Sequence, residues 1–171
     1  MDFGLSNEQE MIIDSVKNFV EKELYPHEDE VEKSNHIDES LAESIKKKAI
    51  QLGLYATNMP EEYGGGGLDT LTLCLLEKEL GKANFGLQYI VARPSNILMA
   101  CKGDQIEKYL IPTIRGEKVD CLAMTEPNAG SDVRSMQCRA EKDGDFFVIN
   151  GSKHFISHAD MADFVILFAA S

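Results

Sequence analysis

Up to about residue 118, hydrophobic residues recur at the three- and four-residue spacing of amphipathic helices. Ser6-Asn7-Glu8-Gln9 has the form of a capping box, in which Ser and Gln side chains bond free backbone N–H groups. An apolar stripe follows at Ile12, Val16, Phe19, Val20 and Leu24, and Pro26 then disfavours helix at the residue before it. Further helical patterns cover 38–52, 69–81, 87–101 with an interruption at Pro94, and 104–115. Residues 1–117 are therefore predicted to form an all-α domain.

After residue 118 the hydrophobic period changes to two, which predicts β-strands. Residues 119–124 form a short apolar run, and 136–142 and 146–150 are extended segments joined by Asp143-Gly144-Asp145. The Asp-Gly pair favours a hairpin between these two segments. Residues 153–157 and 163–170 are predicted as further strands, so 118–171 is expected to be a second, β-rich domain and the fold class is α+β.

Composition narrows the class of protein. The 171 residues are 43% hydrophobic and 27% charged, which is typical of a globular chain, and the net charge is −12. Such an acidic balance argues against nucleic acid and anionic membrane surfaces as partners. No stretch approaches the roughly 20 apolar residues of a membrane span, and no secretory signal is expected at the N-terminus. The four cysteines include no C-x-x-C pair, so we interpret them as reduced thiols in a cytoplasmic protein.

The stretch Met124-Thr125-Glu126-Pro127-Asn128-Ala129-Gly130-Ser131-Asp132 is the first candidate for chemistry. Pro127 and Gly130 interrupt regular structure, so the backbone turns there and exposes N–H groups. The small residues Ala129, Gly130 and Ser131 let an oxygen-rich ligand approach the main chain closely. The alternative is a polar loop that merely connects two strands.

The stretch Asn150-Gly151-Ser152-Lys153-His154-Phe155-Ile156-Ser157 is the second candidate. On a strand, Phe155 and Ser157 point to the same face, where an aromatic plate beside a hydroxyl suits a flat ring with polar edges. The alternative is a core Phe beside a surface Ser. On such a strand His154 and His158 lie about 13 Å apart, too far to share a metal ion, so no metal site is expected.

These stretches, with Pro60-Glu61-Glu62-Tyr63-Gly64-Gly65-Gly66-Gly67-Leu68-Asp69, occur in an order that resembles the acyl-CoA dehydrogenase family. The matching pieces are Thr125 to Asp132 and Ile149 to Ser157, and the resemblance spans nearly the whole chain. It implies an N-terminal helical domain (1–117) followed by the first strands of an incomplete antiparallel β-barrel-like middle domain (118–171). The C-terminal helical bundle of the family is expected to be absent from these residues.

The resemblance also implies FAD as cofactor and assigns roles by position. Its cofactor-contacting residues would be Leu122, Met124, Thr125, Gly130, Ser131, Phe155, Ile156 and Ser157. Thr125 would bond the isoalloxazine, Ser157 would bond flavin N5, and Phe155 would pack on the flavin where most members have Trp. A Phe keeps the stacking surface but loses the indole N–H donor.

Substrate contacts implied by the resemblance are Ser131, near the phosphopantetheine or pyrophosphate, and Arg93 and Ser95, beside the acyl pocket. Arg93 and Ser95 could meet a polar or carboxylate acyl tail. The alternative for Arg93 is an ion pair with one of the 29 acidic residues of the chain.

The activity implied is α,β-dehydrogenation of an acyl-CoA thioester, with electrons passed to an electron-transfer flavoprotein. The family's catalytic glutamate comes from later chain, so no catalytic residue is assigned, and Glu126 and Asp132 are not promoted in its place. The 171 residues alone are expected to be inactive, and the full-length protein to be a homotetramer or homodimer. Alternatives are an acyl-CoA oxidase or an enoyl-CoA reductase of the same fold, or a non-catalytic fragment or binding module.

Overall fold

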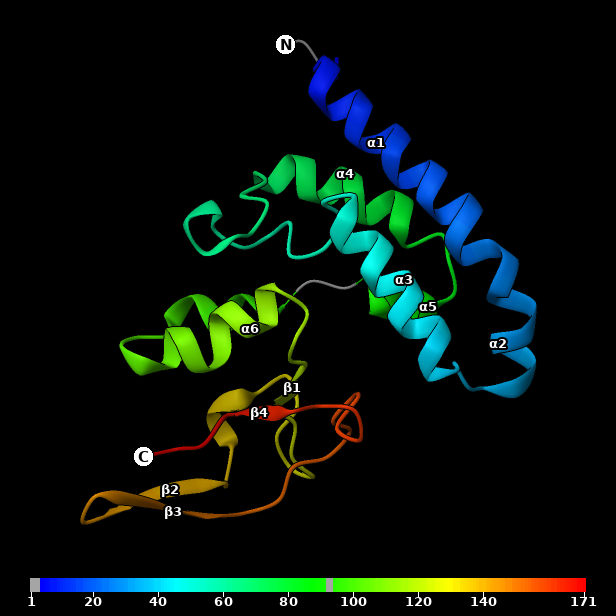
Figure 1. Cartoon of the computed structure of the whole chain (residues 1–171). Coiled ribbons are helices and arrows are strands. Elements are labelled where there is room, and N and C mark those ends of the chain that lie inside the picture. The colour runs from blue at the N-terminus through cyan, green and yellow to red at the C-terminus, as the bar shows by residue number, and fades with distance from the viewer. Residues whose placement is uncertain (1–3, 92–93) are drawn as a thin grey trace. The chain divides into compact units, whose positions relative to one another are not determined.

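The computed structural model describes residues 4–91 and 94–171. The chain separates into two compact units, Met1–Glu117 and Lys118–Ser171, which we call the helical unit and the strand unit. Figure 1 shows helices α1 to α6 in the first and strands β1 to β4 in the second. None of the helices among the described residues is long and apolar enough to cross a bilayer.

The first long helical segment begins at the predicted capping box. Ser6 Oγ accepts from Gln9 N at 3.2 Å, and Gln9 Oε1 accepts from Ser6 N at 3.1 Å. Helix α1 (Asn7–Phe19) continues through a π-helical turn (Val20–Leu24) and a 3₁₀ turn (Tyr25–His27) into α2 (Glu28–Ser34). Pro26 therefore changes the helix type without ending the segment, because it sits in the first turn of a new helical piece, where no backbone N–H is needed.

The remaining helices follow the predicted patterns, with shorter bounds near prolines. Helices α3 (Glu39–Gln51) and α4 (Thr70–Leu80) match the expected segments. The 87–101 pattern becomes α5 (Phe85–Ile90) and a 3₁₀ turn (Asn96–Ala100), and the 104–115 pattern becomes a π turn (Ile106–Leu110) and α6 (Ile111–Ile114). A further 3₁₀ turn spans Glu61–Tyr63.

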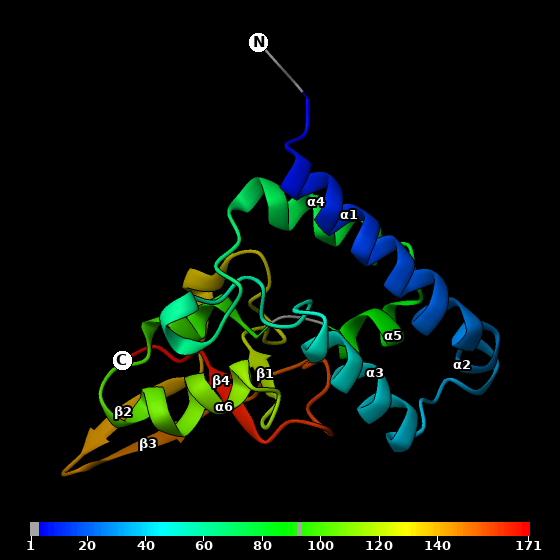
Figure 2. The ribbon, with the colours of Figure 1, turned by 45° about the horizontal axis from the view of Figure 1, so that its top comes forward.

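Helix α1 lies along α4, as both views of the ribbon show (Figures 1 and 2). Gln9 Nε2 on α1 donates to Thr72 Oγ1 on α4 at 3.3 Å. Four of the five residues of the predicted stripe are buried here together with apolar residues from the rest of the unit, and the fifth, Ile12, is partly buried against them. The core consists of Val16, Phe19, Val20, Leu24, Val31, Ile45, Ala49, Leu54, Leu76, Leu80, Ala83, Leu87 and Val91.

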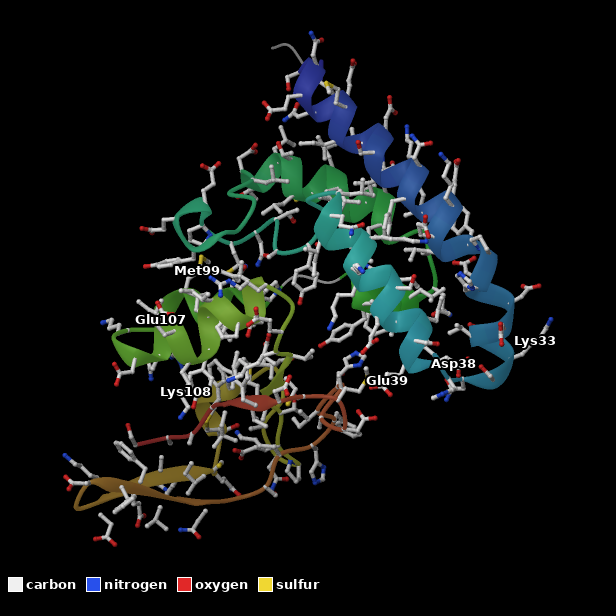
Figure 3. All side chains as sticks on the ribbon, viewed as in Figure 1. Lys33, Asp38, Glu39, Met99, Glu107 and Lys108 are labelled. Carbon is white, nitrogen blue, oxygen red and sulfur yellow. The ribbon has the colours of Figure 1, made fainter. Side chains whose placement is uncertain are left out.

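Charged side chains of the helical unit extend from its surface. In Figure 3, Lys33 near the end of α2 and Asp38 and Glu39 at the start of α3 project away from the ribbon. Lys33 lies 3.9 Å from Asp29, and both side chains are exposed. Exposed pairs of this kind contribute little to stability, so the helical unit depends mainly on its apolar core.

The strand unit contains two separate strand pairs. The predicted hairpin is confirmed: β2 (Arg139–Asp143) pairs antiparallel with β3 (Phe146–Asn150), and Gly144 takes a φ of 59° in the turn. Strand β1 (Asp120–Ala123) pairs with β4 (Phe164–Leu167) in parallel, so the expected antiparallel arrangement is wrong for this pair. A parallel pair needs a long crossover, and residues 124–163, which include the hairpin, supply it. Barrel-like closure stays a prediction.

Candidate functional site

The proline loop, residues 124–138, leaves the end of β1 and turns at Pro127, as its sequence predicts. Glu126 N donates to Ala129 O at 2.9 Å, and Ala129 N donates to Glu126 O at 3.3 Å. Beyond this turn, Asp132 Oδ1 accepts from Arg134 N at 3.2 Å and caps a short 3₁₀ turn (Val133–Ser135). The tip of the loop is therefore folded by its own hydrogen bonds.

The Glu126 carboxylate closes the base of the proline loop. Its Oε2 accepts from Gln137 N at 2.6 Å, and its Oε1 accepts from Cys138 N at 2.9 Å. Both donors lie on the outgoing arm of the loop, immediately before β2. One side chain therefore joins the two arms at a point where no strand ladder pairs them.

Lys153 connects this loop to the return loop, residues 151–163. Its Nζ donates to Glu126 Oε1 at 2.8 Å and to Met124 O at 3.0 Å, and only 7% of the Lys153 side chain and 4% of the Glu126 side chain are exposed. His154 N donates to Thr125 O at 2.8 Å. The two stretches singled out in the sequence are thus neighbours in space.

These bonds also set the charge state of the Glu126 carboxyl. The Lys153 ammonium, followed by the backbone N–H groups of Gln137 and Cys138, lowers the pKa of Glu126 to about 2. The carboxylate is therefore ionised throughout the physiological range. The sequence alone assigns Lys153 no role, because a single lysine in a motif becomes informative only when its burial and partners are known.

The predicted cofactor residues of the proline loop differ in exposure. Leu122 on β1 is exposed between buried Cys121 and Ala123, and Met124 and Thr125 are half-buried. Gly130 and Ser131 are exposed at the tip of the loop, and no atom lies within 4 Å of the place a Cβ on Gly130 would occupy. A ligand could therefore approach the backbone closely at Gly130.

Residues 153–157 do not form the predicted strand. Phe155 has a φ of 57°, and its side chain is 90% exposed, while Ile156 is half-buried and Ser157 exposed. The prediction failed because the side chain of Lys153 and the backbone of His154 bond to residues 124–126 and do not join a strand ladder. Phe155 is therefore held near the proline loop by the hydrogen bond from the neighbouring His154 to Thr125. The alternation of side chains along a strand does not place it there.

Family models account for nearly all of this chain. The model described as "Acyl-CoA dehydrogenase, N-terminal domain" matches residues 6–117, and that described as "Acyl-CoA dehydrogenase, middle domain" matches residues 121–171. The chain belongs to the acyl-CoA dehydrogenase family. The family resemblance noted in the sequence is thereby confirmed, as is the α+β fold class.

The curated relatives of this chain have names that state different activities. The probable acyl-CoA dehydrogenase YngJ of Bacillus subtilis is 38% identical over 100% of this chain and 45% of its own length. The 3-(aryl)acrylate reductase of Clostridium sporogenes is 35% identical over 96% of this chain and 44% of its own length. The chain thus spans less than half the length of these two relatives.

A solved structure of similar fold covers 100% of this chain and 45% of its own, with 36% identity and a TM-score of 0.83. It comes from a study of the electron transferring flavoprotein of Acidaminococcus fermentans and flavin-based electron bifurcation. At this identity and TM-score, the chain shares its fold with the matching part of that structure.

The residues of the two loops are suited chemically to the flavin that this family implies. Hydroxyls are present at Thr125, Ser131 and Ser157, the ring of Phe155 is open for stacking, and the backbone at Gly130 is accessible. A planar ring with polar edges needs these donor and stacking groups. Within residues 4–91 and 94–171, no group of three or more His, Cys, Asp or Glu side chains could hold a metal ion.

Of the two predicted substrate residues in the helical unit, only Ser95 is among the described residues. Arg93 lies outside the described residues. Ser95 is half-buried, and its Oγ accepts from Ile97 N at 3.4 Å. It lines a cavity of about 440 Å³ together with Glu77, Leu80, Phe85, Gln88, Tyr89, Pro94 and Asn96.

Proposed function

We propose that this chain provides the flavin-facing loops of an FAD-dependent acyl-CoA dehydrogenase. The observation that carries the proposal is the link between the two motif loops: Lys153 bonds Glu126 and Met124, and His154 N bonds Thr125 O. Family membership supports the proposed reaction class, the α,β-dehydrogenation of an acyl-CoA thioester. FAD, when bound, supplies the acceptor for the two electrons.

The roles proposed for the loop residues are those that the family resemblance implies, and the chemistry of their side chains fits these roles. Thr125 and Ser157 hold the polar edge of the flavin with their hydroxyls, and Phe155 stacks on its face. Leu122, Met124 and Ile156 supply apolar contacts. Gly130 and Ser131, exposed at the tip of the proline loop, meet the phosphate-bearing parts of cofactor or substrate, where a small residue permits close approach.

Neither acid of the proline loop is proposed as the base that removes the α-proton. The two oxygens of Glu126 accept three hydrogen bonds, and its pKa of about 2 makes it a weak proton acceptor at neutral pH. Asp132 caps the turn at Arg134 N. We propose that the base belongs to a part of the protein outside these residues.

We further propose an electron-transfer flavoprotein as the acceptor, a homodimer or homotetramer as the assembly, and the cytoplasm as the compartment. The similar structure from the Acidaminococcus flavoprotein study supports the first. Free thiols at all four cysteines, of which Cys121 and Cys138 are buried, fit a reducing compartment. Ser95 and the cavity it lines are proposed to receive the acyl chain, with Arg93 nearby in sequence.

A second candidate function is reduction of a carbon–carbon double bond, and the 3-(aryl)acrylate reductase among the relatives favours it. The two functions run in opposite directions. A dehydrogenase reduces its bound flavin with a saturated acyl-CoA, whereas a reductase oxidises reduced flavin with an unsaturated acid or thioester.

The test is anaerobic mixing of the complete, FAD-loaded protein with short, medium, branched and aromatic acyl-CoA esters. We expect at least one to bleach the visible absorbance of oxidised flavin, and an electron-transfer flavoprotein to restore it faster than oxygen does. Reoxidation by oxygen alone would indicate an oxidase, and bleaching by none of the esters would contradict the proposed dehydrogenation.

A further inference from the structure

We propose that Glu126 and Lys153 form a positioning clamp that holds the proline loop and the return loop in register for flavin binding. This inference rests on the proposed function. The two residues contact each other and the loop backbones, and neither is proposed to touch the reacting atoms.

The clamp ties three consecutive residues of one loop to two of the other. Lys153 Nζ bonds Met124 O at 3.0 Å and Glu126 Oε1 at 2.8 Å, and His154 N bonds Thr125 O at 2.8 Å between them. Thr125 thus lies between two residues held by the same ammonium. Its backbone cannot shift relative to the return loop unless at least one of these bonds breaks.

The same carboxylate fixes the outgoing arm of the proline loop. Glu126 accepts from Gln137 N at 2.6 Å and from Cys138 N at 2.9 Å. At this point Gly151 of the return loop comes so close that a Cβ on it would lie 2.6 Å from Cys138 Cα. The clamp therefore reaches both arms of the loop, where the backbones of the two loops are in direct contact.

Burial makes this pair specific for one arrangement of the loops. Two charges removed from water are tolerated only when their hydrogen-bonding capacity is satisfied. Here the carboxylate accepts three hydrogen bonds, and the ammonium has two oxygen partners, with Met136 Sδ at 4.0 Å in a third direction. A shifted loop would leave a buried charge without partners, so alternative registers are disfavoured.

The test measures FAD affinity of the complete protein by quenching of flavin fluorescence. The variants are Lys153→Met, the double variant Glu126→Gln/Lys153→Met, and the control Lys142→Met, which removes an exposed lysine on β2. We expect Lys153→Met to raise the Kd for FAD about 10-fold or more, because an unpaired carboxylate stays buried. Lys142→Met should leave the Kd within about twofold of the unchanged protein, as expected for a surface substitution.

The double variant separates positioning from simple stabilisation. It removes both charges, so the strand unit should regain part of the thermal stability lost in Lys153→Met, because no unpaired charge remains. Recovery is partial because the amide of the Gln side chain offers one oxygen to the two N–H groups of Gln137 and Cys138. FAD affinity should nevertheless stay low and the visible spectrum of bound flavin should shift, since the loops are no longer held in register. Recovery of both stability and FAD affinity in the double variant would overturn the clamp.

Hydrogen exchange of the flavin-free protein tests the clamp independently of the proposed function. The amides of Gln137, Cys138 and His154 donate the bonds described above, so we expect them to exchange faster in Lys153→Met than in Lys142→Met. If the unchanged protein does not bind FAD, the proposed function fails, while faster exchange still supports the clamp. Equal exchange in the two variants would overturn the clamp whatever the protein binds.

Discussion

The helical unit and the strand unit are each stabilised internally by a different kind of interaction. In the helical unit, large apolar side chains such as Leu24, Ile45 and Leu87 are fully buried in one cluster. In the strand unit, the buried apolar residues are the small Cys121, Ala123, Ala129 and Cys138, whereas Phe146 on β3 is 77% exposed. Apolar burial therefore orders the helical unit, while backbone hydrogen bonds and the buried Glu126–Lys153 pair order the candidate site.

The largest effect is expected from a cavity in the helical unit. Leu87 on α5 is fully buried, so Leu87→Ala should lower the free energy of unfolding by about 2–5 kcal/mol. Met11 on α1 is 71% exposed, so Met11→Ala should change the free energy of unfolding by less than about 0.5 kcal/mol. Urea denaturation followed by circular dichroism measures both. Similar effects of the two substitutions would contradict an apolar core as the source of stability.

A smaller and pH-dependent effect is expected in the strand unit. The folded-state pKa of Glu126, about 2, is below its ordinary value of 4.5, so the carboxylate stabilises the fold fully above about pH 4.5. This contribution is lost as the pH falls from about 4.5 towards about 2, because protonation breaks the pair with Lys153.

Hydrogen exchange at Gln137 and Cys138 between pH 5 and pH 2.5, corrected for intrinsic exchange rates, follows this loss. Their protection should fall with pH in the unchanged protein. In Glu126→Gln, protection should be lower at pH 5 and should depend less on pH. If the pH dependence of protection is the same in Glu126→Gln, other groups cause it. The buried ion pair would then not be what orders the candidate site.

Helices and strands that depend on the local pattern of hydrophobic and turn residues could be predicted from the sequence. Helices α3 and α4 follow from their apolar spacing, and the β2–β3 hairpin follows from Asp143-Gly144. Segments whose conformation depends on residues far away in the sequence could not be predicted in this way. The left-handed backbone at Phe155 accompanies bonds from Lys153 and His154 to residues 124–126, and no periodicity encodes such bonds. Parallel pairing of β1 with β4 likewise depends on the path of the connecting chain.

In the candidate site, too, some features could be predicted from the sequence and others only from the structure. Motif residues such as Thr125 and Ser157 were named from the sequence because their order resembles one family. The buried Glu126–Lys153 pair, which brings their loops together, emerged only from the structure, because burial and partner choice depend on tertiary packing.

If the proline loop and the return loop contact one bound flavin, substitutions in either loop must weaken FAD binding, which a titration of variants of the complete protein measures. Thr125→Val and Ser157→Ala each remove one proposed donor, so each should raise the Kd for FAD about fivefold, the loss of roughly one hydrogen bond. Together they should weaken binding further. An unchanged Kd in the variant that carries both Thr125→Val and Ser157→Ala would show that the two loops do not bind one flavin.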